Sequence, residues 1–212
     1  MAPVQLPLDL GFRPAMGAAD FMVADSNGAA VGWLDRWPDW PAPALVVHGP
    51  AGCGKSHLTQ VWRARTGARA LAMADLSAAD LPAVLGAAGE VAVDDAERVA
   101  GAGQERALLH LYNLVNEAGG HLLLTGRAPP ARWRLGLADL ASRLRAAPAV
   151  AVGEPDDALL AAVLVKLFAD RQLRVGDEVL RFLLLRMERS FAAARRLVAA
   201  LDDHSLAASR PV

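Results

Sequence analysis

The segment with the clearest chemistry runs from Gly49 to Ser56 and reads Gly-Pro-Ala-Gly-Cys-Gly-Lys-Ser. It matches G-x-x-x-x-G-K-[ST], and an apolar run precedes it, as in a phosphate-binding loop. Glycines let backbone N–H groups turn toward phosphate oxygens at a helix N-terminus. We expect Lys55 to reach the β- and γ-phosphates and Ser56 to bind Mg²⁺, with the lysine side chain solvated when no nucleotide is bound. The predicted contacts are Gly49, Pro50, Ala51, Gly52, Cys53, Gly54, Lys55, Ser56 and His57.

Two consecutive carboxylates, Asp94 and Asp95, follow the apolar run 91–93. Ligands of parallel α/β proteins bind outside the carboxyl ends of the strands, so carboxylates delivered there can hold a metal-bound phosphate. We expect Asp94 to hold Mg²⁺ through water and Asp95 to position or activate the attacking water. Glu97 is expected to be a solvated loop residue.

Short apolar runs alternating with helical patterns must position these groups. Strands are expected at 44–48, 69–73, 91–93, 121–125 and 149–152, and helices at 55–65, 77–85, 104–118 and 137–144. This alternation predicts an α/β fold with a parallel sheet covered on both faces. After Gly153 the apolar spacing is helical, and Asp156 or Asp157 can cap the first of three helices, with the others at 177–187 and 191–204. Prolines predict an irregular region over 1–43.

Composition excludes several classes of protein. The 212 residues are 54% hydrophobic with a net charge of −1, which argues against disorder and against independent binding of nucleic acid. The single cysteine, Cys53, excludes a disulfide framework. No apolar run suits a membrane span or a signal peptide, so we expect a cytoplasmic protein. The sequence contains only two lysines, Lys55 and Lys166, so the position of each is more informative than in a lysine-rich protein. The tryptophan-rich segment 33–40 is expected to cover a sheet edge, with base stacking or partner contact as the alternative.

Further motifs resemble those of the DnaA branch of the AAA+ ATPases. Residues 122–130 resemble its sensor 1 strand and Pro-Pro turn, 139–144 its arginine-finger helix, 195–197 its sensor 2 and 21–27 its adenine-side motif. The resemblance spans residues 20 to about 206. It implies an AAA+ P-loop core with a small C-terminal three-helix lid, ADP or ATP as the nucleotide, and Mg²⁺. The expected division is an N-terminal peptide and linker over 1–19, a nucleotide-binding core over 20–153 and a lid over 154–212.

The resemblance also implies roles for single residues. Thr125 corresponds to sensor 1, although Gly126-Arg127 follows it where this branch usually has an acidic or amide residue. Arg143 corresponds to a finger that acts on the ATP of a neighbouring molecule. Arg195 corresponds to sensor 2 better than Arg196, because its spacing to the next leucine fits. The adenine-side contacts implied are Phe21, Val23 and Asn27.

The N-terminal segment Gln5-Leu6-Pro7-Leu8-Asp9-Leu10 is similar to the hexapeptide that docks on the bacterial sliding clamp. The clamp-binding residues implied are Gln5, Leu6, Leu8 and Leu10. Without a helix-turn-helix DNA-binding domain, such a chain is expected to contact DNA only indirectly. The resemblance implies a negative regulator of replication initiation that docks on the clamp and stimulates hydrolysis of ATP bound to the DnaA initiator, with weak ATPase activity of its own. The alternatives are a self-associating loader or remodeller that cycles its own ATP, and a clamp-tethered adaptor with an inactive phosphate loop.

Overall fold

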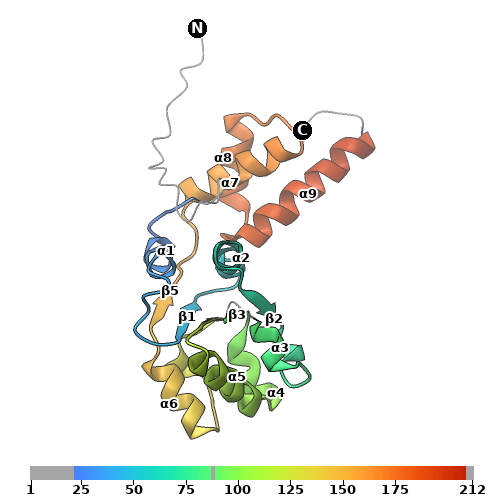
Figure 1. Ribbon diagram of the computed structural model, residues 1–212. Coiled ribbons are helices and arrows are strands. Elements are labelled where there is room, and N and C mark those ends of the chain that lie inside the picture. The colour runs from blue at the N-terminus through green and yellow to red at the C-terminus, as the bar shows by residue number, and fades with distance from the viewer. Residues whose placement is uncertain (1–21, 87–88, 209–212) are drawn as a thin grey trace.

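The computed structural model describes residues 22–86 and 89–208, with side chains as far as residue 204. It contains a sheet of five parallel strands in the order β2-β3-β4-β1-β5 (Figure 1). The strands are β1 Ala44–His48, β2 Arg69–Leu71, β3 Glu90–Val93, β4 His121–Gly126 and β5 Ala149–Ala151. The predicted α/β fold with a parallel sheet is confirmed. The segment similar to a clamp-binding peptide, and Phe21, lie outside the described residues.

Helices cover both faces of this sheet, and the alternation of side chains along the strands explains why. In β1, Leu45 and Val47 pack with residues of one cluster, while Ala44 and Val46 pack into a second cluster on the opposite face. The first cluster includes residues of α1 Gly28–Asp35 and α2 Lys55–Thr66. The second includes residues of α3 Leu81–Leu85, α4 Val99–Ala102, α5 Glu105–Glu117 and α6 Ala138–Ala146. Strands buried on both faces read as near-continuous apolar runs, as β4 does.

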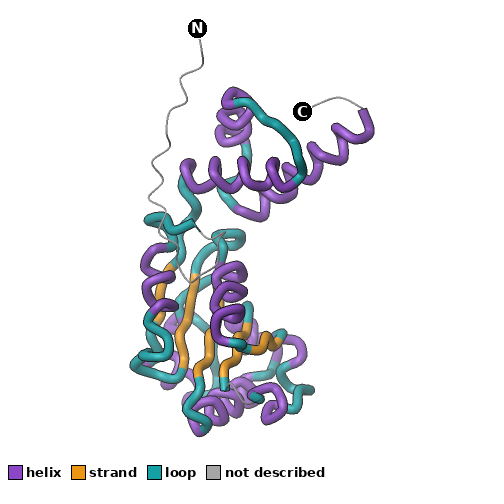
Figure 2. Tube along the Cα trace, turned by 45° about the horizontal axis from the view of Figure 1, so that its top comes forward, coloured by secondary structure: helices purple, strands orange, loops and turns teal. Residues whose placement is uncertain are grey.

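The C-terminal helices form a separate bundle beyond one end of the sheet (Figure 2). They are α7 Asp157–Asp170, α8 Asp177–Arg186 and α9 Phe191–Ala208. Their core contains Leu164, Phe168, Leu183, Ala194 and Val198. Of the two aspartates that could cap the first of these helices, Asp156 does so, because its carboxylate accepts from the Leu159 N–H at 2.7 Å. Within the described residues, no helix is both long and apolar enough to cross a membrane.

Three elements differ from the sequence-based expectation. The region expected to be irregular contains α1, which has no proline between 28 and 35 and buries Ala30, Val31 and Leu34. The strand expected over 69–73 ends at Leu71, because Met73–Asp75 forms a 3₁₀ turn, η1. Helix α3 begins at Leu81 rather than at residue 77. There the Asp80 carboxylate accepts from the Ala83 N–H at 3.3 Å and fixes the start of the helix.

The tryptophan-rich segment lies at the amino end of the central strands. The Trp40 ring stacks on Trp62 of α2 at a centroid distance of 5.6 Å, and its indole N–H donates to the Trp33 carbonyl oxygen at 2.8 Å. Trp37 and Trp40 both contact the ring of His121, the first residue of β4, edge-on. The segment therefore packs on the fold, and its place is at the opposite end of the strands from the phosphate-binding loop.

Candidate nucleotide-binding site

The phosphate-binding loop, residues 49–56, connects β1 to α2. Gly52 and Gly54 have φ angles of 76° and 106°, a region that glycine adopts without steric cost. A Cβ on Gly52 would lie 2.6 Å from the Ser190 Cβ, and one on Gly54 would lie 3.0 Å from the Phe191 ring. The Phe191 N–H also donates to the Gly52 carbonyl oxygen at 3.0 Å. These glycines therefore allow both the turn of the loop and the close approach of the start of α9.

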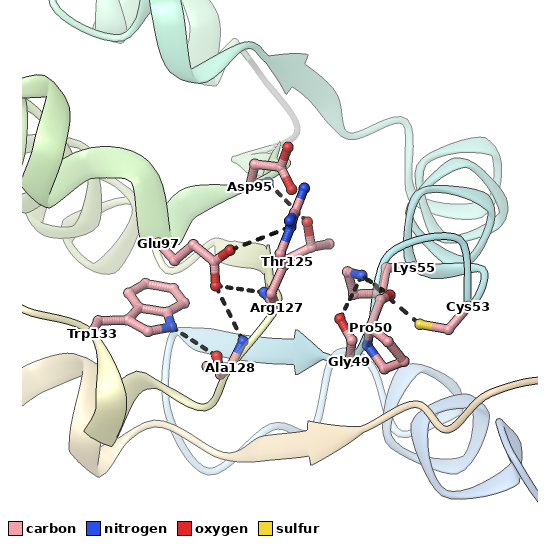
Figure 3. A network of polar contacts seen from close by, with 10 residues as sticks. All are labelled: Gly49, Pro50, Cys53, Lys55, Asp95, Glu97, Thr125, Arg127, Ala128 and Trp133. Carbon is pink, nitrogen blue, oxygen red and sulfur yellow. Dashed lines mark hydrogen bonds and ion pairs between the residues drawn. The ribbon is translucent and has the colours of Figure 1, made fainter. Parts of the chain in front are cut away.

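Lys55 is buried, with 8% of its surface exposed. Its ammonium group donates to the carbonyl oxygens of Gly49 and Pro50, both at 2.8 Å, and lies 3.8 Å from the Cys53 sulfur (Figure 3). The expectation that this side chain is solvated was therefore wrong. The reason is local, because the turn of the loop brings its own carbonyl groups within reach of the lysine.

Burial and charge shift the ionisation of two residues beside Lys55. Burial raises the pKa of the Cys53 thiol, and the nearby Lys55 charge only partly opposes that shift. The pKa of His48, the last residue of β1, is lowered, first by burial and then by the positive charges of Arg132 and Lys55. At neutral pH the Cys53 thiol is therefore protonated and the His48 imidazole is neutral.

The carboxylates after β3 are joined to β4 by a single hydroxyl group. The Thr125 hydroxyl donates to the Asp94 carboxylate at 2.9 Å and accepts from the Asp95 backbone N–H at 3.0 Å. Thr59, on α2, also lies 3.4 Å from the Asp94 carboxylate. Ser56 is exposed at the start of the same helix. A serine hydroxyl and a carboxylate are oxygen donors of the kind that Mg²⁺ takes, so Ser56 and Asp94 are chemically suited to the predicted metal role.

Glu97 was expected to be solvated, and the structure corrects this. Its carboxylate accepts from the backbone N–H groups of Arg127 (2.5 Å) and Ala128 (3.1 Å), and the Trp133 indole donates to the Ala128 carbonyl oxygen at 2.7 Å (Figure 3). A Cβ on Gly126 would lie 2.9 Å from the Trp133 ring and 3.2 Å from the Glu97 carboxylate. A side chain at Gly126, where the resemblance implies an acidic or amide residue, would therefore displace Trp133 or the Glu97 carboxylate.

A cavity of about 430 Å³ opens beside the loop. Among the residues with predicted nucleotide contacts, Asn27 and Arg195 line it together with part of the loop, whereas Val23 packs against the core beside α1 and α2. Arg196 instead pairs with Glu188 at 3.6 Å on the surface. The side chain of Asn27 is buried and holds the preceding turn through hydrogen bonds to backbone groups of residues 22 and 24. The cavity is lined by Met22, Asn27, Gly52, Cys53, Gly54, Lys55, Ser56, His57, Leu58, Gln60, Leu159, Val163, Lys166, Leu167, Phe191 and Arg195.

Arg143 lies on α6 and is not among the residues that line this cavity. Its guanidinium donates to the Asn113 amide oxygen at 2.6 Å and lies 5.5 Å from the centre of the Tyr112 ring. The Glu105 carboxylate accepts from the Leu137 backbone N–H at 2.6 Å and so anchors the residue before α6. Side chains of α5 therefore fix both the start of α6 and the half-buried guanidinium group on it.

No family model matches the sequence, but solved structures share its fold. Domain III of the Thermotoga maritima replication initiation protein DnaA superposes with a TM-score of 0.73 at 18% identity, over 91% of this chain and 89% of that domain. The replication initiator DnaA bound to AMPPCP and single-stranded DNA superposes with a TM-score of 0.67 at 16% identity. The chain has the fold of a DnaA-type AAA+ domain.

An AAA+ domain of a different protein also superposes, with a lower TM-score. The FIGL-1 AAA domain in complex with ADP has a TM-score of 0.62 at 15% identity, over 79% of this chain. The comparison with the initiator bound to AMPPCP covers 88% of this chain but only 63% of the initiator chain. The likeness therefore concerns the AAA+ part of a longer protein.

Proposed function

We propose that this chain is a regulator similar to Hda, the protein of regulatory inactivation of DnaA. It would bind ADP or ATP, dock on the sliding clamp through residues 5–10 and stimulate hydrolysis of ATP held by the DnaA initiator. The observation that carries this proposal is the position of Arg143, which α5 holds in place outside the chain's own cavity. A guanidinium outside that cavity would serve the nucleotide of a neighbouring molecule.

Nucleotide binding is supported by the complete phosphate-binding motif and by the cavity that part of this loop lines. The loop and Lys55 would contact the phosphates, Arg195 would contact them from α9, and Asn27 would lie near the adenine. Mg²⁺ would be held by Ser56 and, through water, by Asp94, and would neutralise phosphate charge there. Residues 20–153 would then form the nucleotide-binding core and 154–212 the lid.

The action on the initiator would be electrostatic. In the complex, Arg143 would place a fixed positive charge beside the phosphate groups of the partner's ATP, where negative charge is redistributed in the transition state. Its planar guanidinium can donate two parallel hydrogen bonds, which a lysine ammonium does not reproduce. Contact with DNA would be indirect, through the clamp, in keeping with the net charge of −1.

The test is hydrolysis of DnaA-bound ATP in a reconstituted mixture with the clamp loaded on DNA. Arg143→Ala should reduce the stimulated rate by a large factor, since arginine fingers supplied in trans contribute roughly 10³–10⁵ in rate. Its affinities for ADP and for the clamp should be unchanged. Arg145→Ala is the matched control, because Arg145 is an exposed arginine on the same helix. Full stimulation by Arg143→Ala would refute the assignment, and a loss confined to Arg145→Ala would transfer the role to Arg145.

A loader or remodeller that cycles its own ATP is the second candidate. It is favoured by Asp94 and Asp95, which follow β3 next to the loop and which the Thr125 hydroxyl joins. Steady-state turnover of ATP by the purified chain alone, lost in Asp95→Asn, would support this candidate. ATP binding without turnover, together with clamp-dependent stimulation of the initiator, would support the regulator.

A further inference from the structure

The cavity beside the phosphate-binding loop lies between the core and the C-terminal helices. The loop and α2 line one side, and α7 lines another through Leu159, Val163, Lys166 and Leu167. The spacing of these four residues places them on one face of the helix, whereas Leu164 and Phe168 point into the helical bundle. Lys166 is the only charged residue of α7 that faces the cavity.

Among the described residues that line the cavity, the lysine and arginine side chains come from three different elements. Lys55 comes from the loop, Lys166 from α7 and Arg195 from α9, and no aspartate or glutamate is among the described lining residues. The chain as a whole carries a net charge of −1, so positive charge is concentrated at this cavity. A polyanion bound in this cavity would meet basic side chains from three separate elements.

We propose that Lys166 binds the phosphate groups of the nucleotide from the side of the C-terminal helices. A lysine ammonium on its flexible four-carbon stem is a compact point charge, well suited to phosphate oxygens. With Lys55 and Arg195, it would surround a nucleoside di- or triphosphate with cations from three separate elements. This inference rests on the proposed nucleotide binding and adds a ligand that the phosphate-binding motif does not contain.

A consequence is that the nucleotide joins the two parts of the molecule. The phosphate-binding loop precedes α2 in the core, while Lys166 and Arg195 belong to the C-terminal bundle. Phosphate groups that contact both the core and the C-terminal bundle would limit the movement of the bundle relative to the core. Binding would therefore protect backbone amides of α7 from hydrogen exchange as well as those of the loop.

The test measures ADP affinity by calorimetry on the full chain at two NaCl concentrations. Lys166→Gln, which removes the charge at similar length, should raise the Kd for ADP about tenfold or more. It should also weaken the dependence of the Kd on salt, because one screened ionic contact is lost. Lys166→Arg should retain most of the affinity. Arg174→Gln is the matched control, because it removes an exposed charge from the loop between α7 and α8, outside the cavity.

Equal affinities of Lys166→Gln and Arg174→Gln for ADP would overturn this inference while leaving nucleotide binding intact. A weakened affinity with an unchanged salt dependence would also overturn it, since that result indicates a structural effect rather than an ionic contact. If the unmodified chain does not bind ADP, the proposed function itself fails, and this inference fails with it. The melting temperature of each variant without nucleotide shows whether the fold is intact.

Discussion

Thr125→Val removes one hydroxyl group and nearly preserves the shape of the side chain. In the folded protein this hydroxyl is buried, donates to Asp94 at 2.9 Å and accepts from the Asp95 N–H at 3.0 Å. The substitution leaves a carboxylate without its best donor and a backbone N–H without its acceptor. A hydrogen bond to a charged group contributes about 1.5–3 kcal/mol, and an unsatisfied buried group costs about 1–3 kcal/mol. Because the half-buried Asp94 recovers part of its solvation from water, we expect a total loss of about 2–3 kcal/mol.

Thermal unfolding of the nucleotide-free protein measures this loss. At about 2–4 °C per kcal/mol for a chain of this size, Thr125→Val should melt about 4–12 °C below the unmodified protein. Thr125→Ser keeps the hydroxyl, so its melting temperature should fall much less. The melting temperature of Thr59→Val should also fall less. The Thr59 hydroxyl donates to the Lys55 carbonyl oxygen of its own helix, and its distance to the Asp94 carboxylate is longer, at 3.4 Å. A melting temperature of Thr125→Val within about 1 °C of the unmodified protein would refute the bridging role.

Three further predictions concern the loop and the N-terminal peptide. Lys55→Ala should lower the stability of the nucleotide-free protein by about 1–2 kcal/mol in chemical denaturation, because two loop carbonyl groups lose their donor; an unchanged midpoint would contradict this. The fold lowers the pKa of His48, so its neutral form favours folding, and stability should fall as the pH drops below about 6.5. In melting curves recorded across pH, His48→Gln should reduce that fall. Gln5→Ala combined with Leu8→Ala should abolish capture by immobilised clamp at an unchanged melting temperature, whereas a clearly lower melting temperature would indicate that the peptide packs on the domain.

The sequence was sufficient to predict the elements whose signals are local. The apolar runs predicted the parallel strands, and glycines on both sides of α2 marked the ends of that helix. Helix α1 was missed because a short segment rich in glycine and alanine has little periodicity, and its packing against the sheet stabilises it. Tertiary contact of this kind overrides weak local preference.

Parts of the candidate site were missed for a different reason. Glu97 binds a turn that lies 30 residues further along the chain, and only the pairing of β3 with β4 brings the two together. Arg143 itself was named from the sequence, but its contact with Asn113, 30 residues away on another helix, was not. The burial of Lys55 depends on the path of the loop, which the motif does not specify in atomic detail. Residue type thus predicted a chemistry, whereas the fold determined which neighbour each group meets.

The contact between the phosphate-binding loop and the start of α9 affects how substitutions in the loop should be interpreted. A side chain at Gly52 would meet Ser190 before it met any ligand, and one at Gly54 would meet Phe191. An alanine at either position would thus displace the C-terminal bundle as well as strain the loop. Loss of nucleotide affinity in such a variant would combine two defects, so it would not measure what the loop contributes to phosphate binding. A substitution of Lys55 adds no side chain at this contact, and the hydrogen bonds that it removes lie within the loop.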